Sequence, residues 1–211
     1  MHAKSQAHQT LALFDFDGTL YSQDSFTGFI FYALNKPHIF KRGCKILPYI
    51  LAYYCKCYPA DEMRPRLFYS MFKGLPASEI SSLAKDYARD VLMHALDPKI
   101  LRQLQQHQHY GHHVILVSAS LSLFLQPCCD ELNIHLLSTH IEIQNGVITG
   151  HYQSADCSGE QKKIAVSTHY QLNQYQHIYA YGNSDEDNDM LALAHFAYRH
   201  DQKQSLPIII P

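Results

Sequence analysis

Two aspartates separated by a single residue carry the clearest chemical signal in the chain. Asp15 and Asp17 follow the apolar run 11–14 (LALF) and precede Gly18 and Thr19. A short apolar run that ends in polar side chains is typical of a buried parallel strand. Open α/β sheets bind ligands beyond the carboxyl ends of such strands. Two neighbouring carboxylates there suit a hard divalent cation, and one of them can act as a nucleophile on phosphorus.

Three later segments bring further reactive side chains to the ends of expected elements. Ser118 and Ala119 follow the apolar run VILV, and Lys162 lies in the segment CSGEQKK. The run IYAY leads into residues 182–187, Gly-Asn-Ser-Asp-Glu-Asp, and then Met-Leu. Taken singly, each of these segments is common, so only their order along one chain indicates a shared site.

In that order the four segments resemble the motifs of the haloacid dehalogenase superfamily of aspartate-nucleophile phosphatases. The family's motifs are DxDGT, a Ser or Thr after a strand, a lysine, and usually GDSxxD followed by ML. The chain is most similar to the phosphoserine-phosphatase-like branch, subfamily IB, in which a helical C1-type cap lies between the first two motifs. The resemblance spans nearly the whole chain, although the inserted segment matches mainly by its position and helicity.

The resemblance implies a Mg²⁺-dependent phosphomonoester phosphatase. Asp15 would attack phosphorus and become an aspartyl phosphate, while Asp17 would protonate the leaving oxygen and then deprotonate water. Ser118 and Lys162 would offset the charge of the phosphoryl oxygens. The positions expected to contact the phosphate or the rest of the substrate are Gly18, Thr19, Asp24 and Ala119.

The expected Mg²⁺ ligands are Asp15, the backbone carbonyl of Asp17, Asn183 and Asp187. The family usually has an aspartate where this chain has Asn183, which removes one negative charge and predicts weaker metal binding. A shifted register has the same four-residue spacing and pairs Asp185 with Asp189. The Asn183 register also aligns Gly182 and the Met-Leu pair, so it is preferred. Lys163 could take the place of Lys162, although the spacing from the cysteine favours Lys162.

The expected substrate is a small organic phosphate. Asp24 lies nine residues beyond Asp15, where phosphoserine phosphatases carry an acid that meets the substrate amine. This position favours phosphoserine or a similar phosphoamine, but a solvated residue at the entrance to the cap is an equally good interpretation.

The apolar runs 11–14, 114–117 and 178–181, with shorter runs at 196–198 and 206–210, predict strands with helices between them. The expected fold class is therefore α/β, a doubly wound (Rossmann-like), mostly parallel sheet. Asp97 and Pro98 predict the start of a helix that stops at Gly111. Helical spacing is also present in 80–91 and 160–172, and alternation in 141–152 predicts a hairpin that turns at Asn-Gly.

The segment between the first two strands is far longer than one crossover needs. We therefore expect residues 22–94 to form an inserted helical cap domain, and residues 1–21 with 95–211 to form the core. A chain of 211 residues with 46% hydrophobic content fits one core plus one insertion.

The composition excludes several classes. A net charge of −2 argues against a nucleic-acid-coating protein. Residues 1–10 show no secretory signal, the apolar stretch 46–54 is too short to span a membrane, and the six cysteines lack zinc-site spacing. A cytoplasmic enzyme with reduced thiols is expected, and the sequence gives no indication of its oligomeric state.

The charges are unevenly distributed, because residues 25–60 hold five basic side chains and no acid. They allow a second hypothesis, a phospholipid head-group phosphatase working at a membrane surface. A plain pair of cap helices with snorkelling lysines is the preferred interpretation. The substitution at Asn183 also permits a catalytically lapsed family member that binds a phosphorylated ligand. A phosphotransferase, in which an alcohol replaces water as the acceptor, is compatible with the same motifs.

Overall fold

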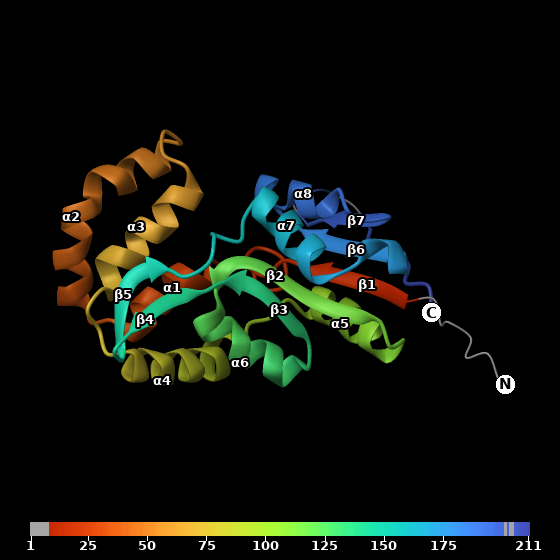
Figure 1. The fold of residues 1–211 in the computed structure, drawn as a ribbon, viewed down its shortest axis with the longest axis horizontal. Coiled ribbons are helices and arrows are strands. Elements are labelled where there is room, and N and C mark those ends of the chain that lie inside the picture. The colour runs from red at the N-terminus through yellow and green to blue at the C-terminus, as the bar shows by residue number, and fades with distance from the viewer. Residues whose placement is uncertain (1–8, 201, 203–204) are drawn as a thin grey trace.

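A five-stranded parallel sheet forms the centre of the protein (Figure 1) in a computed structural model that describes residues 9–200, 202 and 205–211. The strands lie in the order β3 (His135–Thr139), β2 (His113–Leu121), β1 (Gln9–Phe14), β6 (Tyr175–Gly182) and β7 (Phe196–Arg199). All four neighbouring pairs are parallel. Because β1 has β2 on one side and β6 on the other, the order of the strands reverses at β1. This is the switch point at which such sheets bind ligands.

Helices cover both faces of the sheet, which confirms the predicted doubly wound α/β class. Alternate residues of β1 point to opposite faces, as the strand period requires. Phe14 belongs to one buried core together with residues of α5 (Pro98–His109) and α6 (Ser122–Leu132). Leu13 belongs to the other, together with residues of α7 (Glu160–His169) and α8 (Asn188–Leu191).

A helical insertion joins β1 to β2. It consists of α1 (Ser25–Ala33), α2 (Lys36–Tyr54), α3 (Ala60–Phe72), α4 (Ala77–Tyr87) and a π-helical turn, η1 (Ala88–Leu92). The rings of Phe29 and Phe72 stack at 5.6 Å between centroids, and Phe29 also contacts Phe124 of α6. Aromatic packing therefore ties the base of the insertion to the core, while α2 and α3 extend away from the sheet (Figure 1).

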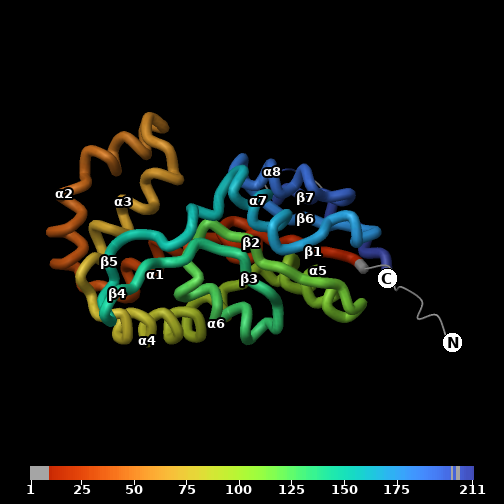
Figure 2. Tube along the Cα trace, in the orientation of Figure 1, coloured from red at the N-terminus to blue at the C-terminus, as the bar shows by residue number. Residues whose placement is uncertain are grey.

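The predicted hairpin is confirmed as β4 (Ile141–Gln144) and β5 (Val147–Tyr152). Asn145 and Gly146 have positive φ angles of 51° and 77°, as a tight turn of this type needs. The hairpin is not part of the central sheet but lies against α3 (Figure 2). Ile148 exchanges backbone hydrogen bonds with the segment after α3, donating to Leu75 at 3.0 Å and accepting from Gly74 at 2.9 Å.

The start of α5 agrees with the sequence, since Asp97 caps it by accepting from the backbone N–H groups of Lys99 and Ile100. The predicted strand at 206–210 is wrong. Pro207 has no N–H to donate to a ladder, and side chains satisfy the backbone instead: Gln103 donates to the Pro207 carbonyl at 2.8 Å, and Ile210 N–H donates to the Tyr179 hydroxyl at 3.1 Å. The helix expected at 160–172 ends earlier, at His169.

Strand β3 was not predicted, because its sequence HLLST is short and lacks both a clear alternation and a long apolar run. The interpretation of the N-terminal ten residues falls almost wholly outside the described part of the chain. Within the described residues, no helix is both long and apolar enough to cross a bilayer. The six cysteines are free thiols.

Candidate active site

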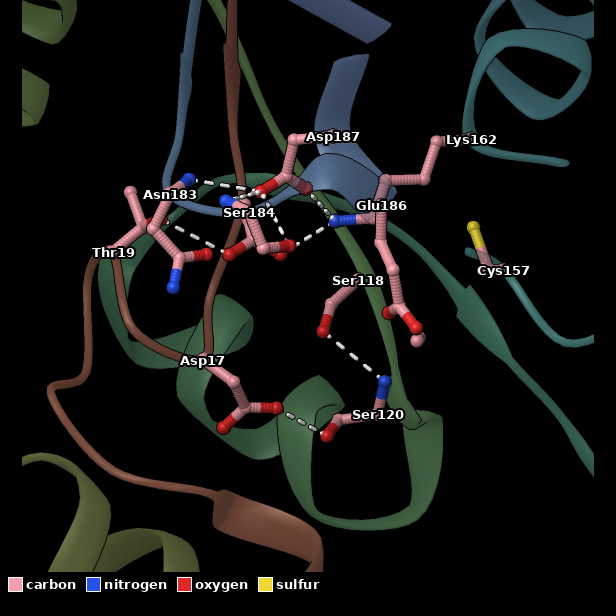
Figure 3. Close-up of polar contacts among 12 residues, drawn as sticks. Asp17, Thr19, Ser118, Ser120, Cys157, Lys162, Asn183, Ser184, Glu186 and Asp187 are labelled. Carbon is pink, nitrogen blue, oxygen red and sulfur yellow. Dashed lines mark hydrogen bonds and ion pairs between the residues drawn. The ribbon is translucent and has the colours of Figure 1, made fainter. Parts of the chain in front are cut away.

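The carboxyl edge of the sheet gathers the residues that the motifs singled out. Asp15 directly follows β1, Ser118 lies in the second half of β2, and Asn183 directly follows β6. Lys162 reaches the same place from α7, and Asp187 from the short helical segment after β6 (Figure 3). All five line one cavity of about 640 Å³, which extends from this edge between α1, α2 and α3.

Lys162 lies at the centre of the polar end of this cavity. Its side chain is 2% exposed, and its Nζ donates to Asp15 Oδ1 and to Asp187 Oδ1 at 2.5 Å each. Burial alone would lower the pKa of Lys162, but the two carboxylates outweigh it and raise that pKa, so the side chain stays protonated. Lys163, the other candidate lysine, is exposed on the surface of α7.

Asp187 is held as a carboxylate by hydrogen bonds on both of its oxygens. Oδ1 accepts from Lys162, and Oδ2 accepts from the backbone N–H groups of Asn183 and Ser184 at 2.9 and 3.0 Å. Burial acts to raise the pKa of Asp187, yet Lys162 and these N–H groups hold it below the usual value. Asp187 therefore positions both Lys162 and the turn that carries Asn183.

Asp15 is 5% exposed, and its second oxygen, Oδ2, accepts from the Thr19 hydroxyl at 3.0 Å. Burial raises the pKa of Asp15 to about 7, against the lowering effect of Lys162 and with a smaller raising effect from Asp187. Two buried carboxylates thus share one ammonium group, which leaves a negative charge without a partner. A further cation beside Asp15 would hold it ionised.

Asp17 occupies a different environment, in which hydroxyl and amide groups surround a partly buried carboxylate. Its Oδ1 accepts from Ser25 N–H at 2.7 Å, and its Oδ2 accepts from the Ser120 hydroxyl at 2.5 Å and the Ser25 hydroxyl at 3.1 Å. Burial raises the pKa of Asp17 to about 6, although these hydrogen bonds act to lower it. A carboxyl that titrates close to neutral pH suits general acid and base catalysis.

The residues expected to hold a metal supply a set of oxygen donors. Asn183 packs against Gly18, which has a φ of +79°; a Cβ there would lie 1.9 Å from Asn183 Nδ2, so only glycine leaves room for the amide. The carboxylate of Asp15, the carbonyl of Asp17 and the amide oxygen of Asn183 are all ligand types that suit Mg²⁺. Among the described residues no cluster of three His, Cys, Asp or Glu side chains could hold a metal. A metal bound here would therefore need the Asp17 carbonyl and the Asn183 amide as ligands beside the Asp15 carboxylate.

The shifted register places its acids elsewhere. The side chain of Asp185 is 89% exposed and pairs with Arg199 Nη2 at 2.9 Å. Neither Asp185 nor Asp189 lines the cavity, whereas Asn183 and Asp187 do.

The remaining expected residues also lie at the cavity. Ser118 is buried, and its hydroxyl accepts from Ser120 N–H at 3.1 Å (Figure 3). Ala119 lines the cavity, and its carbonyl accepts from Thr139. Asp24 also lines it and caps α1, because its Oδ1 accepts from Thr27 N–H at 2.8 Å.

The sequence did not point to Arg64, which links the insertion to the site. From α3, its Nε and Nη2 donate to the two oxygens of Asp156 at 2.8 and 2.9 Å. Its Nη1 donates to Glu186, which neighbours Asp187, at 3.1 and 3.2 Å. These carboxylates raise the pKa of Arg64 despite its burial. No motif signals an arginine whose partners lie about ninety residues or more along the chain.

The fold and the site together define an α/β protein with a doubly wound sheet and two buried acids bridged by a lysine at its carboxyl edge. The model of the haloacid dehalogenase-like hydrolase family matches residues 12–192. The chain belongs to this family, which confirms the family that the motifs predicted.

Curated relatives and solved structures agree with this assignment. A probable phosphatase of Mycobacterium tuberculosis is 27% identical over 194 residues, a match that covers 87% of this chain and 66% of the relative. Protein CicA of Caulobacter vibrioides is 26% identical over 190 residues, covering 87% of this chain and 82% of the relative. This chain thus spans just under two thirds of the mycobacterial protein.

Among solved structures, a Bordetella pertussis protein of unknown function has a TM-score of 0.74 at 22% identity, covering 90% of this chain and 89% of the other. A substrate-bound phosphoserine phosphatase has a TM-score of 0.62 at 13% identity, covering 90% and 84%. At these identities the likeness shows that the fold is shared.

Proposed function

We propose that the chain is a Mg²⁺-dependent phosphomonoester phosphatase that works through an aspartyl phosphate on Asp15. The observation that carries the proposal is the buried Lys162, which bridges Asp15 and Asp187 at the polar end of a cavity of substrate size. A phosphoryl group placed there meets a nucleophile, a fixed ammonium group and the Ser118 hydroxyl. These are the groups that phosphoryl transfer needs. The name of the mycobacterial relative supports the same activity.

Each residue of the site has a separate role in the proposed reaction. One oxygen of Asp15 forms a bond to phosphorus as the bond from phosphorus to the substrate oxygen breaks, and Asp17 gives its proton to that leaving oxygen. Asp17 then takes a proton from the water that attacks the phosphorus of the aspartyl phosphate, which releases phosphate and restores Asp15. Lys162 and Ser118 bind the phosphoryl oxygens throughout. Bound Mg²⁺ would be held by Asp15, Asp17 and Asn183, and it would offset the negative charge that Lys162 leaves uncompensated.

We further propose that residues 22–94 act as the cap of this site, over a core formed by residues 1–21 and 95–211. The hairpin β4–β5 falls within the residue range of the core but extends the cap, because it packs on α3 rather than on the central sheet. Arg64 joins this cap to the core through Asp156 and Glu186. A cap closed in this way would exclude bulk water from the aspartyl phosphate.

The test is phosphate release from p-nitrophenyl phosphate and from a panel of amino-acid, amine, sugar and lipid phosphates, with Mg²⁺ and with EDTA. The proposal predicts turnover that needs Mg²⁺ and is lost in Asp15→Asn. Asp185→Asn, whose side chain is exposed outside the cavity, is the matched control and retains turnover. A folded protein that is stabilised by phosphate but turns over no ester would instead establish a lapsed, phosphate-binding family member. When an acceptor alcohol is added, release of the substrate's own alcohol (p-nitrophenol, for example) faster than release of phosphate would establish a phosphotransferase.

A further inference from the structure

The cavity beyond the catalytic groups is apolar. We define the apolar arm as the part of the cavity between α1, α2 and α3, lined by Ile30, Ile39, Ile50, Met63, Leu67 and Met71. The only charged residue that α2 and α3 contribute to the cavity lining is Arg64, and its guanidinium group is already paired with Asp156 and Glu186. The arm therefore offers no free charge that would bind a second polar group of a substrate.

A small polar phosphate does not account for this space. Cavities of about 300–1,000 Å³ hold ligands larger than a phosphorylated amino acid, and this cavity, with its polar catalytic end included, measures about 640 Å³. A short polar substrate would leave the apolar arm filled with water. A hydrocarbon chain would displace that water and gain free energy for each buried methylene group.

We propose that the substrate is an amphiphilic phosphomonoester, whose phosphate reaches Asp15 and whose hydrocarbon chain occupies the apolar arm. This proposal rests on the proposed phosphatase activity and specifies its substrate class. It is preferred to phosphoserine because the arm is lined by apolar side chains, which a hydrocarbon chain contacts favourably and a charged amino acid does not.

Gly43 offers a way to block the apolar arm without disturbing the fold. It lines the cavity from α2, and a Cβ built there meets only Met71 Cε, at 3.9 Å. The Cβ of Gly43→Leu therefore meets no clash, and the rest of its side chain would extend into the arm that Gly43 lines. The substitution also replaces a poor helix former with a good one. Ser82→Leu adds a leucine at an exposed position of α4, outside the cavity and outside α2, and is the control.

The experiment measures kcat/KM for butyl, hexyl, octyl and decyl phosphate, each below its critical micelle concentration, together with phosphoserine. Burial of a methylene group predicts a rise of about fourfold per added carbon, until the chain fills the arm. Gly43→Leu is expected to abolish most of this rise and to leave butyl phosphate turnover within about threefold of wild type. Ser82→Leu keeps the full rise.

The outcomes separate this proposal from the proposed function. A kcat/KM that does not change with chain length, or that is highest for phosphoserine, overturns the amphiphilic substrate while the phosphatase activity stands. An equal loss of butyl and decyl phosphate turnover in Gly43→Leu also overturns it. If the folded protein with Mg²⁺ turns over none of the esters, the proposed function fails and this proposal fails with it.

The outer face of α2 carries a second, independent inference. Phe40, Cys44, Leu47, Leu51 and Tyr54 recur at spacings of three and four residues and are all exposed, so they form one stripe along the helix. Tyr54 also lines the cavity, so the stripe reaches its entrance.

Basic side chains accompany this stripe. Lys36 continues the stripe four residues before Phe40, and Lys41 and Lys45 each follow a stripe residue directly. Helix α2 contains no acidic residue, and none of these three lysines forms an ion pair with any described residue. An exposed apolar stripe with uncompensated positive charge beside it is complementary to an anionic lipid surface. We infer that α2 lies on such a surface, which would present the amphiphilic substrate to the cavity entrance.

Vesicle sedimentation tests this inference. The protein should bind vesicles that contain phosphatidylglycerol and release them at high salt, and it should bind phosphatidylcholine vesicles at least tenfold more weakly. Phe40→Ser combined with Leu47→Ser should weaken binding about tenfold. Ile164→Ser changes an exposed apolar residue of α7 and should have no effect. Equal binding to neutral vesicles, or no binding to either kind, would overturn the inference. So would a wild-type dimer that becomes a monomer in the double variant.

Discussion

Replacement of Lys162 by Met removes the ammonium group that bridges two buried carboxylates, Asp15 and Asp187, while keeping a side chain of similar length. Breaking a buried ion pair by deleting one partner costs about 3–5 kcal/mol. The variant can limit this cost by keeping one additional proton on the Asp15–Asp187 pair. Protonation of an aspartate with an ordinary pKa costs roughly 4 kcal/mol at pH 7 and roughly 2 kcal/mol at pH 5.5. We therefore expect Lys162→Met to lose about 4 kcal/mol of stability at pH 7 and about 2 kcal/mol at pH 5.5.

The sign of this pH dependence follows from proton binding. The folded variant holds one more proton than folded wild type, whereas the unfolded chains titrate alike, so the stability difference grows as pH rises. Urea unfolding of both proteins at the two pH values, with EDTA to exclude metal, measures the effect. Lys163→Met changes the exposed neighbour and should alter stability by less than about 0.5 kcal/mol. A loss below about 1 kcal/mol, or one that does not shrink at pH 5.5, would refute the buried triad as the organising feature of the site.

Three further predictions concern other parts of the molecule. Arg64→Ala removes the contacts of α3 with Asp156 and Glu186 and should lower kcat/KM by about 10- to 100-fold. Arg66→Ala is the control, because the Arg66 guanidinium lies 3.7 Å from the Tyr49 ring centroid within the insertion. It should lower kcat/KM less than threefold. Equal losses of kcat/KM in Arg64→Ala and Arg66→Ala, measured by steady-state assay, would show that the ion pairs between Arg64 and the core have no role in catalysis. Asn183→Asp restores a carboxylate beside Gly18 and should reduce the Mg²⁺ concentration for half-maximal activity about tenfold; an unchanged Mg²⁺ titration would remove Asn183 from the metal site. His107 is fully buried, and burial with His112 lowers its pKa to about 3. Because the unfolded chain takes up a proton below about pH 6.5 and the folded protein does not, wild type should lose about 2 kcal/mol between pH 7 and pH 5 at this site. In urea unfolding, His107→Gln should lack this part of the loss of stability. An equal change in the free energy of unfolding between pH 7 and pH 5 in wild type and His107→Gln would contradict the prediction.

The sheet could be predicted from the sequence because each central strand is buried on both faces and reads as an apolar run. The motifs that follow these runs come together because parallel strands share one carboxyl edge, and Asp15, Ser118 and Asn183 lie there as expected. An apolar run does not always form a strand, as residues 206–210 show. Their apolar content resembles that of a strand, but Pro207 and the side chains of Gln103 and Tyr179 satisfy the backbone in another way.

The links between the insertion and the core could not be predicted, since they depend on contacts between distant parts of the chain. Arg64 meets Asp156 and Glu186 only after the sheet has formed and the hairpin has packed on α3. Ser25 and Ser120 reach Asp17 from two separate elements in the same way. The apolar arm is likewise a product of packing: the same isoleucines and methionines would fit a solid helical core, and only their arrangement leaves a cavity.

The central claim is that Asp15 carries the phosphoryl group during turnover. Acid quenching during steady-state hydrolysis of a phosphate ester, followed by borohydride reduction and peptide mass spectrometry, tests it most directly, because borohydride converts an aspartyl phosphate to homoserine. The account predicts homoserine at position 15 in wild type and none in Asp15→Asn or in the absence of substrate. Turnover without homoserine at position 15, or with the modification on another carboxylate such as Asp17 or Asp187, would contradict it.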